Sequence, residues 1–162
     1  MNKIIVTPSP TADTRSCDPT TVTKDQLAAS TLQHIEDVRK AMNFFIAYMR
    51  KAGECHDDHK LQTLDKFYEA FQGKMKDPSW LMDHYDNTRH HLTGLATPKD
   101  DTNLIDVLEY IADCTMASMC RKASDKRYPI ELDSATLQQA FANTVQMLAD
   151  AVVVVSSKDE EN

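Results

Sequence analysis

The sequence predicts a single-domain, all-α protein built from about five main helices. Its 162 residues suit one domain, and 41% hydrophobic with 27% charged residues is typical of globular chains. Apolar residues recur at three- and four-residue steps, the period of an amphipathic helix. The six prolines fall outside these stretches and each of the three glycines follows one, which indicates turns between helices.

The two ends of the chain lack this periodicity. Residues 1–23 are rich in Thr, Ser, Pro and Asp, so a flexible N-terminal arm is expected, with a short strand at Ile4–Val6. Residues 24–155 then form the helical domain. The last residues, 156–162, are expected to be a disordered acidic tail.

The five helices follow in order along the domain. They are expected over about 24–52, 57–72, 78–92, 101–123 and 134–155. Pro78 suits the first turn of the third helix, with Asp77 as its cap. The β-branched end of the fifth, Ala151–Val155, is either its final turns or a short extension.

Charge and cysteine content exclude several classes of protein. A net charge of −7 and a pI near 5.3 argue against binding long nucleic acid or anionic lipid. No apolar run approaches the roughly 18–20 residues of a membrane span, and the stretch before Pro8 is too short for a signal peptide. Four cysteines without a CxxC pair suggest reduced thiols, so a cytoplasmic location is expected.

Histidines and acids concentrate in the middle of the chain. All six histidines lie between residues 34 and 91: His34, His56, His59, His84, His90 and His91. On the predicted fourth helix, Asp106, Glu109 and Asp113 share a polar stripe at i, i+3 and i+7. Imidazole and carboxylate are the ligands that Zn, Mn, Fe and Co prefer, and a cation offsets the cost of grouping acids inside a bundle. The pattern therefore predicts a divalent metal site.

The order of these residues resembles a known family. His34, then His56–Asp57, then Asp113 matches the H…HD…D signature of the HD superfamily of metal-dependent phosphohydrolases. The chain is also similar to an uncharacterised family of phage and bacterial HD-like proteins with blocks HI..VR.A, HDxSK, W…HY..N..HH and IEM..DW. The matching segments are HIEDVRKA (34–41), HDDHK (56–60), Trp80 followed by HYDNTRHH (84–91), and IDVLEYIAD (105–113), within about residues 31–120. His59 replaces a serine of that family and Leu61 an aromatic residue.

The resemblance implies an HD-like bundle that holds one or two divalent ions from among Mn, Fe, Zn, Co and Mg. The implied ligands are His34, His56, Asp57, His84, His91 and Asp113. A two-metal site is favoured by the extra histidines and by the HDxxK spacing, with Asp57 as the bridging carboxylate. His90 stays an alternative to His91: neighbouring helical positions differ by about 100°, so one faces away, and His91 has the i+7 relation to His84.

Other residues are candidates for handling the substrate. Lys60 and Arg89 would neutralise charge on a phosphate, and Asp65 is either a general acid or base or a solvated acid. Asp106 and Glu109 are either partners that orient histidines or a plain polar face. His59 is expected to be exposed or to face the substrate.

The expected function is hydrolysis of a nucleotide or another small phosphate or phosphodiester by a metal-activated water. A small phosphorylated substrate is the expected partner, with no long nucleic acid and no membrane. Because HD-type proteins are often oligomers, a homo-oligomer is allowed. One alternative is an HD-type di-iron oxygenase with the same ligands. Another is a non-enzymatic phage factor that binds a nucleotide or a host protein, located in the host cytoplasm.

Overall fold

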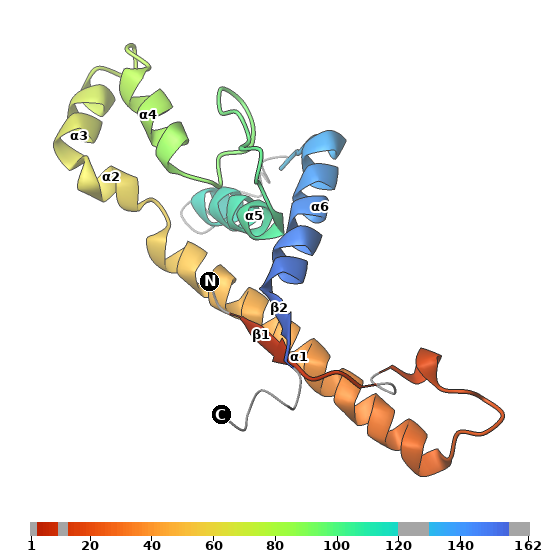
Figure 1. The fold of residues 1–162 in the computed structure, drawn as a ribbon. Helices are drawn as coiled ribbons and strands as arrows, with labels where there is room; N and C mark the ends of the chain where they lie inside the picture. Colours follow the sequence, from red (N-terminus) through yellow and green to blue (C-terminus); the bar gives the residue numbers. More distant parts are fainter. Residues whose placement is uncertain (1–2, 10–12, 120–129, 156–162) are drawn as a thin grey trace. The chain divides into compact units, whose positions relative to one another are not determined.

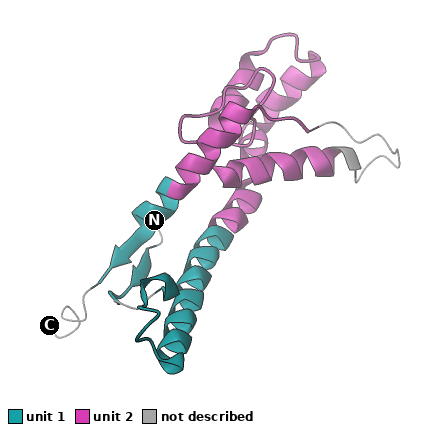
Figure 2. Cartoon of the chain, turned by 90° about the vertical axis from the view of Figure 1, so that its right-hand side faces the viewer, with its two compact units in different colours: residues 1–47, 146–162 teal, residues 48–145 magenta. Residues whose placement is uncertain are grey.

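The computed structural model describes residues 3–9, 13–119 and 130–155, without the side chains of 118 and 119. Within these ranges it contains six α-helices, one short 3₁₀ helix and two three-residue strands, so the all-α prediction is confirmed (Figure 1). Residues 120–123 of the predicted fourth helix and the predicted tail lie outside the described residues. The chain divides into two compact units, residues 1–47 with 146–162 and residues 48–145 (Figure 2).

The first unit pairs the two ends of the chain. Strand β1 (Ile4–Val6) runs parallel to β2 (Val152–Val154), with Ile4 opposite Val152. The predicted strand at 4–6 is confirmed, and the β-branched end of the last helix is a short extension because valines favour extended backbone. The expected flexible arm therefore carries a paired strand and a 3₁₀ helix, η1 (Thr14–Ser16).

The long helix α1 (Lys24–Cys55) does not stop at the glycine that was expected to end it. Gly53 lies inside the helix, because a glycine costs a helix interior only about 1 kcal/mol relative to alanine. The chain turns instead at Asp57, which has φ of 59°. The predicted second helix follows as two pieces, α2 (Asp58–Gln62) and α3 (Leu64–Gln72), divided by the non-helical backbone of Thr63.

The second unit has its core where helix α5 (Leu104–Met119) meets the first part of α6 (Ser134–Ala151). Leu92, Val107, Tyr110 and Ala140 are buried together there. Helix α4 (Ser79–Asn87) is shorter than predicted because the backbone of Thr88 is extended. None of the helices in the described ranges combines the length and hydropathy that a membrane span needs.

Candidate metal centre

The centre begins at the turn between α1 and α2. His56 and Asp57 occupy the two positions between these helices, and Asp57 adopts the left-handed backbone conformation. Residues other than glycine enter this region at a cost, with aspartate and asparagine among the more tolerant. Such backbone strain concentrates at functional sites. The turn brings His56 to Glu109 and Asp113 of α5, and it brings Asp57 to His84 and His90.

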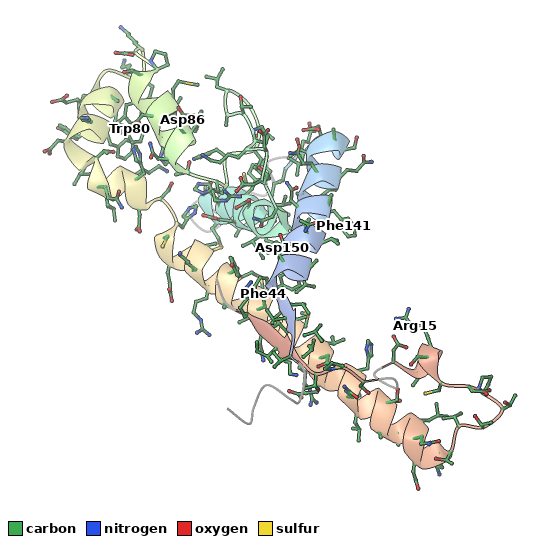
Figure 3. All side chains as sticks on the ribbon, viewed as in Figure 1. Arg15, Phe44, Trp80, Asp86, Phe141 and Asp150 are labelled. Atoms are coloured by element: carbon green, nitrogen blue, oxygen red, sulfur yellow. The ribbon has the colours of Figure 1, made fainter. Side chains whose placement is uncertain are left out.

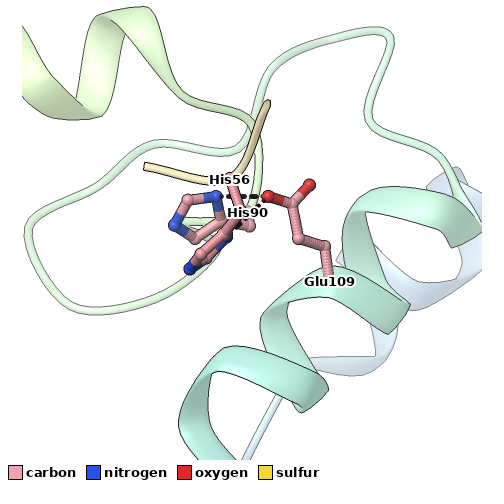
Figure 4. Close-up of side chains that lie close together, drawn as sticks. All are labelled: His56, His90 and Glu109. Atoms are coloured by element: carbon pink, nitrogen blue, oxygen red, sulfur yellow. Dashed lines mark hydrogen bonds and ion pairs between the residues drawn. The ribbon is translucent and has the colours of Figure 1, made fainter. Parts of the chain in front are cut away.

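A carboxylate on α5 holds two of the imidazoles (Figure 4). Glu109 Oε1 lies 2.8 Å from His56 Nδ1 and 2.9 Å from His90 Nδ1. Burial alone would raise the pKa of Glu109, but the hydrogen bonds from His90 and His56 lower it below its ordinary value. An ionised carboxylate at Nδ1 fixes the tautomer in which each ring donates from Nδ1 and keeps its lone pair on Nε2.

The Nε2 atoms of these rings face the Asp57 carboxylate. Its Oδ1 lies 3.7 Å from His90 Nε2 and 3.4 Å from His84 Nε2, and its Oδ2 lies 3.7 Å from His56 Nε2. Lys60 Nζ donates to Oδ2. Burial raises the pKa of Asp57, yet Lys60 and the nearby histidines outweigh it, so the pKa is lowered and the carboxylate is ionised.

A second pair of imidazoles, His84 and His91, also lies beside Asp57. His84 Nε2 and His91 Nε2 are 2.9 Å apart. Burial is the main reason that the pKa of both is lowered to about 4, with neighbouring positive groups adding to it. Both rings are therefore neutral near pH 7 and have a lone pair to offer.

Aromatic packing fixes the position of His84. Trp80, labelled on α4 in Figure 3, stacks on His84 with 5.2 Å between ring centroids and on Phe67 with 4.5 Å. Its Nε1 donates to Thr63 Oγ1 at 3.0 Å. His59 Nδ1 lies 3.3 Å from His84 Nδ1, so this ring adjoins the pair on the side away from Asp57.

These donors fit a divalent cation. Asp57 Oδ1 and His90 Nε2 are buried without a hydrogen-bond partner in the structure, and each such atom is costly to leave unpaired. Ligands held about 2.0–2.2 Å from one ion lie about 3–3.5 Å apart, close to the 2.9–3.7 Å separations found here. Two groups of potential ligands have donor atoms within 4.8 Å of one another: His56, His90 and Glu109, and Asp57, His84 and His91.

Five of the six predicted ligands come together here. Asp113 joins the group through Oδ1, which lies 3.6 Å from His56 Nε2. The structure differs from the sequence reasoning over His90, because both His90 and His91 face the cluster. Residues 88–93 are not helical, so the 100° rule for neighbouring positions does not apply to them. Glu109 is also part of the cluster. This agrees with the first of the two roles considered for it, a partner that orients histidines.

His34, the remaining predicted ligand, is not among the residues that meet at this cluster within residues 48–145. It is an exposed residue of α1 in the first unit, where it lies near enough to Asp13 to act on the pKa of that residue. Between His34 and Cys55 the continuous helix rises about 32 Å. The cluster therefore lacks the first histidine of the H…HD…D signature.

Of the three residues expected to handle the substrate, one lies at the cluster and two do not. Lys60 is at the cluster, bonded to Asp57. Asp65 is exposed on α3 and has no described contact with the cluster. Arg89 is held instead by Asp106, through Nε at 2.8 Å and Nη2 at 2.9 Å, and by Asp101. Its expected role at the phosphate is corrected accordingly, because its hydrogen-bonding groups are committed to these two acids.

A pocket of about 700 Å³ opens beside the cluster, between the last turns of α1 and the face of α5. Its polar lining residues are His56, Asp57, Lys60, Glu109 and Asp113. The remaining wall is made of apolar and small residues. The donors are therefore accessible to a small molecule from this side.

Comparison of the chain with protein-family models, with curated proteins and with solved structures finds no match. The function is therefore argued from the site alone.

Proposed function

We propose that the protein is a metal-dependent phosphohydrolase that acts on a small phosphate ester at this cluster. The observation that carries the proposal is the buried, unpartnered pair of Asp57 Oδ1 and His90 Nε2, surrounded by three further imidazole Nε2 atoms. Buried oxygen and nitrogen atoms that can donate a lone pair, but have no hydrogen-bond partner, favour a cation as that partner. The resemblance of residues 56–60 and 84–91 to the HD-like blocks agrees with this reading.

The donor set favours a transition metal. Four neutral or neutralisable imidazoles outnumber the carboxylates, and imidazole suits Zn, Fe, Co and Mn better than Mg or Ca. The residues that would hold the ions are His56, Asp57, His84, His90, His91 and Asp113. Asp57 Oδ1 lies near both His84 and His90, and its Oδ2 lies near His56, so this carboxylate would be the one shared between two ions.

When bound, a divalent ion lowers the pKa of a water molecule and polarises a phosphoryl oxygen. The side chains of the chain supply the rest. Lys60 brings a positive charge to the wall of the pocket, where it offsets charge on a phosphoryl group. Glu109 keeps the rings of His56 and His90 in one tautomer and one orientation.

The test compares two aspartates. Protein loaded with Mn²⁺, Fe²⁺, Co²⁺ or Zn²⁺ is analysed for metal content and assayed for phosphate release from a panel of phosphate esters. Asp57→Asn is expected to lose metal and at least about 10³-fold in kcat/KM, since the ions supply several kcal/mol of transition-state stabilisation. Asp86→Asn, an exposed residue of α4, serves as the control and is expected to match the parent protein.

A parent protein that binds no metal, or an Asp57→Asn variant with unchanged metal content, would contradict the proposal. Circular dichroism of both variants checks that each remains helical.

The imidazole-rich donor set also favours iron, which supports a second candidate, a di-iron oxygenase of the HD type. Visible and EPR spectra of aerobically purified protein separate the two functions. A mixed-valent iron signal together with no phosphate release from any ester would favour the oxygenase.

A further inference from the structure

The pocket beside the cluster is lined by two chemically different sets of described residues, one polar and one apolar. All of its ionisable lining side chains belong to the cluster or, like Lys60, contact it. The rest of the wall is formed by Met49 on α1, by Leu108 and Met116 on α5, and by small residues such as Ala52 and Ala112. Leu108 and Met116 keep about half of their surface exposed, at 49% and 57%.

The apolar lining residues of the pocket offer few groups that could recognise a nucleoside. Nucleobases are read by hydrogen bonds to their edges or by stacking on aromatic or guanidinium planes, and sugars need hydrogen-bonding partners for their hydroxyls. Among the described residues that line the pocket there is no Ser, Thr, Asn, Gln or Arg and no Phe, Tyr or Trp.

The backbone of most of this wall, away from Gly53 and Ala117 in the last helical turns, does not replace the missing side chains. Met49 and Ala52 lie within α1, and Leu108 and Ala112 lie within α5. Backbone groups in the interior of a helix are already paired with groups four residues away. The wall therefore presents alkyl and thioether groups, which gain from covering apolar surface and not from polar contacts.

We infer that the substrate is a phosphate ester whose organic part is apolar, an alkyl or aryl group, and not a nucleotide. The inference rests on the proposed phosphohydrolase function. In this assignment the phosphate lies beside Lys60, His56 and Asp57, and the organic group lies against apolar lining residues such as Leu108, Met116 and Met49. A pocket of about 700 Å³ is within the usual range for small-molecule sites and has room for such a group.

Hydrolysis by the metal-loaded protein is the first measurement. Hexyl, phenyl and 1-naphthyl phosphate are compared with glycerol 3-phosphate, ribose 5-phosphate and AMP. We expect kcat/KM to be at least tenfold higher for the apolar esters. Faster hydrolysis of AMP or ribose 5-phosphate would overturn the inference and leave the phosphohydrolase function standing.

Binding is measured independently of turnover, by calorimetric titration of hexylphosphonate, phenylphosphonate and methylphosphonate into the metal-loaded protein. The two larger probes are expected to bind at least tenfold more tightly than methylphosphonate. Equal affinities would overturn the inference. If no ester is hydrolysed but this preference is found, the phosphohydrolase function fails while the apolar specificity of the pocket holds.

Two leucine-sized residues on α5 make a matched pair for this titration. Leu108 lines the pocket and Ile111 does not, although their exposed fractions are similar, 49% and 42%. Leu108→Gln is expected to weaken hexylphosphonate binding about tenfold, the effect of losing one apolar contact, and to leave methylphosphonate binding unchanged. Ile111→Gln is expected to change neither.

A second variant narrows the pocket without adding polarity. Ala112→Leu places a larger side chain on the wall and is expected to weaken naphthyl phosphate more than tenfold while sparing methylphosphonate. A Leu108→Gln or Ala112→Leu variant that keeps its helical spectrum and binds the apolar probes as the parent does would overturn the assignment of this wall.

Discussion

Two clusters of charged side chains in residues 48–145 differ in how far their polar groups are satisfied. In the first, the guanidinium of Arg89 lies between Asp106 and Asp101, and Asp106 Oδ2 also accepts from the backbone N–H of Asn103 at 2.9 Å. In the second, Asp57 and His90 each keep a buried atom without a hydrogen-bond partner. Both clusters contain aspartates beside nitrogen-bearing side chains. In the first, all the polar groups named are hydrogen-bonded, whereas in the second two buried atoms have no partner.

The difference separates a structural ion pair from a candidate site. Hydrogen bonds to Asp106, and further ones to Asp101, raise the pKa of Arg89 against the effect of burial, so the cluster is complete within the protein. Around Asp57, by contrast, burial keeps His84 and His91 neutral, with their Nε2 atoms 2.9 Å apart. A perturbed pKa is therefore a better indicator of a functional site when the group can still bind a ligand than when a structural ion pair causes the shift.

The largest effect on stability is expected from breaking the first cluster. Arg89→Met leaves the buried Asp106 carboxylate without its main partner, and we expect a loss of about 3 kcal/mol in the free energy of unfolding. Urea denaturation measures it. Asp101→Asn removes the exposed partner of the same arginine and is expected to cost less than about 0.5 kcal/mol. Loss of bound metal in Arg89→Met, with folding intact, would contradict this separation of the clusters.

A smaller effect is expected at Glu109, which links two imidazoles of the second cluster. Glu109→Gln keeps the shape of the side chain but cannot accept as strongly from both Nδ1–H groups. We expect metal affinity to fall about 10- to 100-fold, as for other carboxylates that orient metal-bound histidines. A competition titration with a chelating dye measures it. Unchanged affinity would show that Glu109 does not orient His56 and His90.

In metal-free protein, the histidines of the second cluster are expected to make the free energy of unfolding depend on pH. The pKa of His84 and His91 is lowered from 6.5 to about 4, so the unfolded chain binds more protons than the folded one between these values. Stability therefore rises as the pH rises through this window and is lost as it falls. Between pH 4.5 and 6.5, above the ordinary pKa of aspartate and glutamate, we expect a change on the order of 1 kcal/mol.

The measurement is urea denaturation in the presence of a chelator at several pH values. His91→Asn is expected to flatten the curve. A slope that is unchanged in this variant would contradict the assignment of the pH dependence to the buried pair.

The smallest effect is expected at the histidine that the sequence motif singled out first. His34→Ala removes an exposed side chain of α1, so the free energy of unfolding is expected to change by less than about 0.5 kcal/mol. The metal content should equal that of the parent protein, as measured by elemental analysis. A loss of metal in His34→Ala but not in Asp86→Asn would reinstate His34 as a ligand.

Periodicity and turn residues were sufficient to predict the helices, but less so their ends. The apolar spacing placed all five helical segments, and the six observed α-helices follow them. The ends at Cys55, Thr63 and Asn87 depend on local backbone conformations that are not evident in the pattern. Gly53 illustrates this, because the small cost of a glycine in a helix interior does not by itself decide where α1 ends.

The candidate site was predictable to the extent that it depends on residue type and order. His56, Asp57, His84 and Asp113 were identified because imidazoles and acids recur in an order that resembles a known family. His34 satisfied the same order, but it lies on the part of α1 that belongs to the other unit and is not among the residues that meet at the cluster. The order of residues does not show that a single helix carries His34 and Cys55 about 32 Å apart along its axis.

The sequence by itself determined the helical class of the protein, the positions of its main segments and a surplus of metal-binding side chains, because these depend on local spacing and chemistry. Tertiary structure alone decided which of those side chains meet. It closed Arg89 into an ion pair and turned both His90 and His91 inward from non-helical backbone. It also left Asp57 Oδ1 buried without a partner. Burial and pairing are properties of contacts between distant segments, so no local pattern records them.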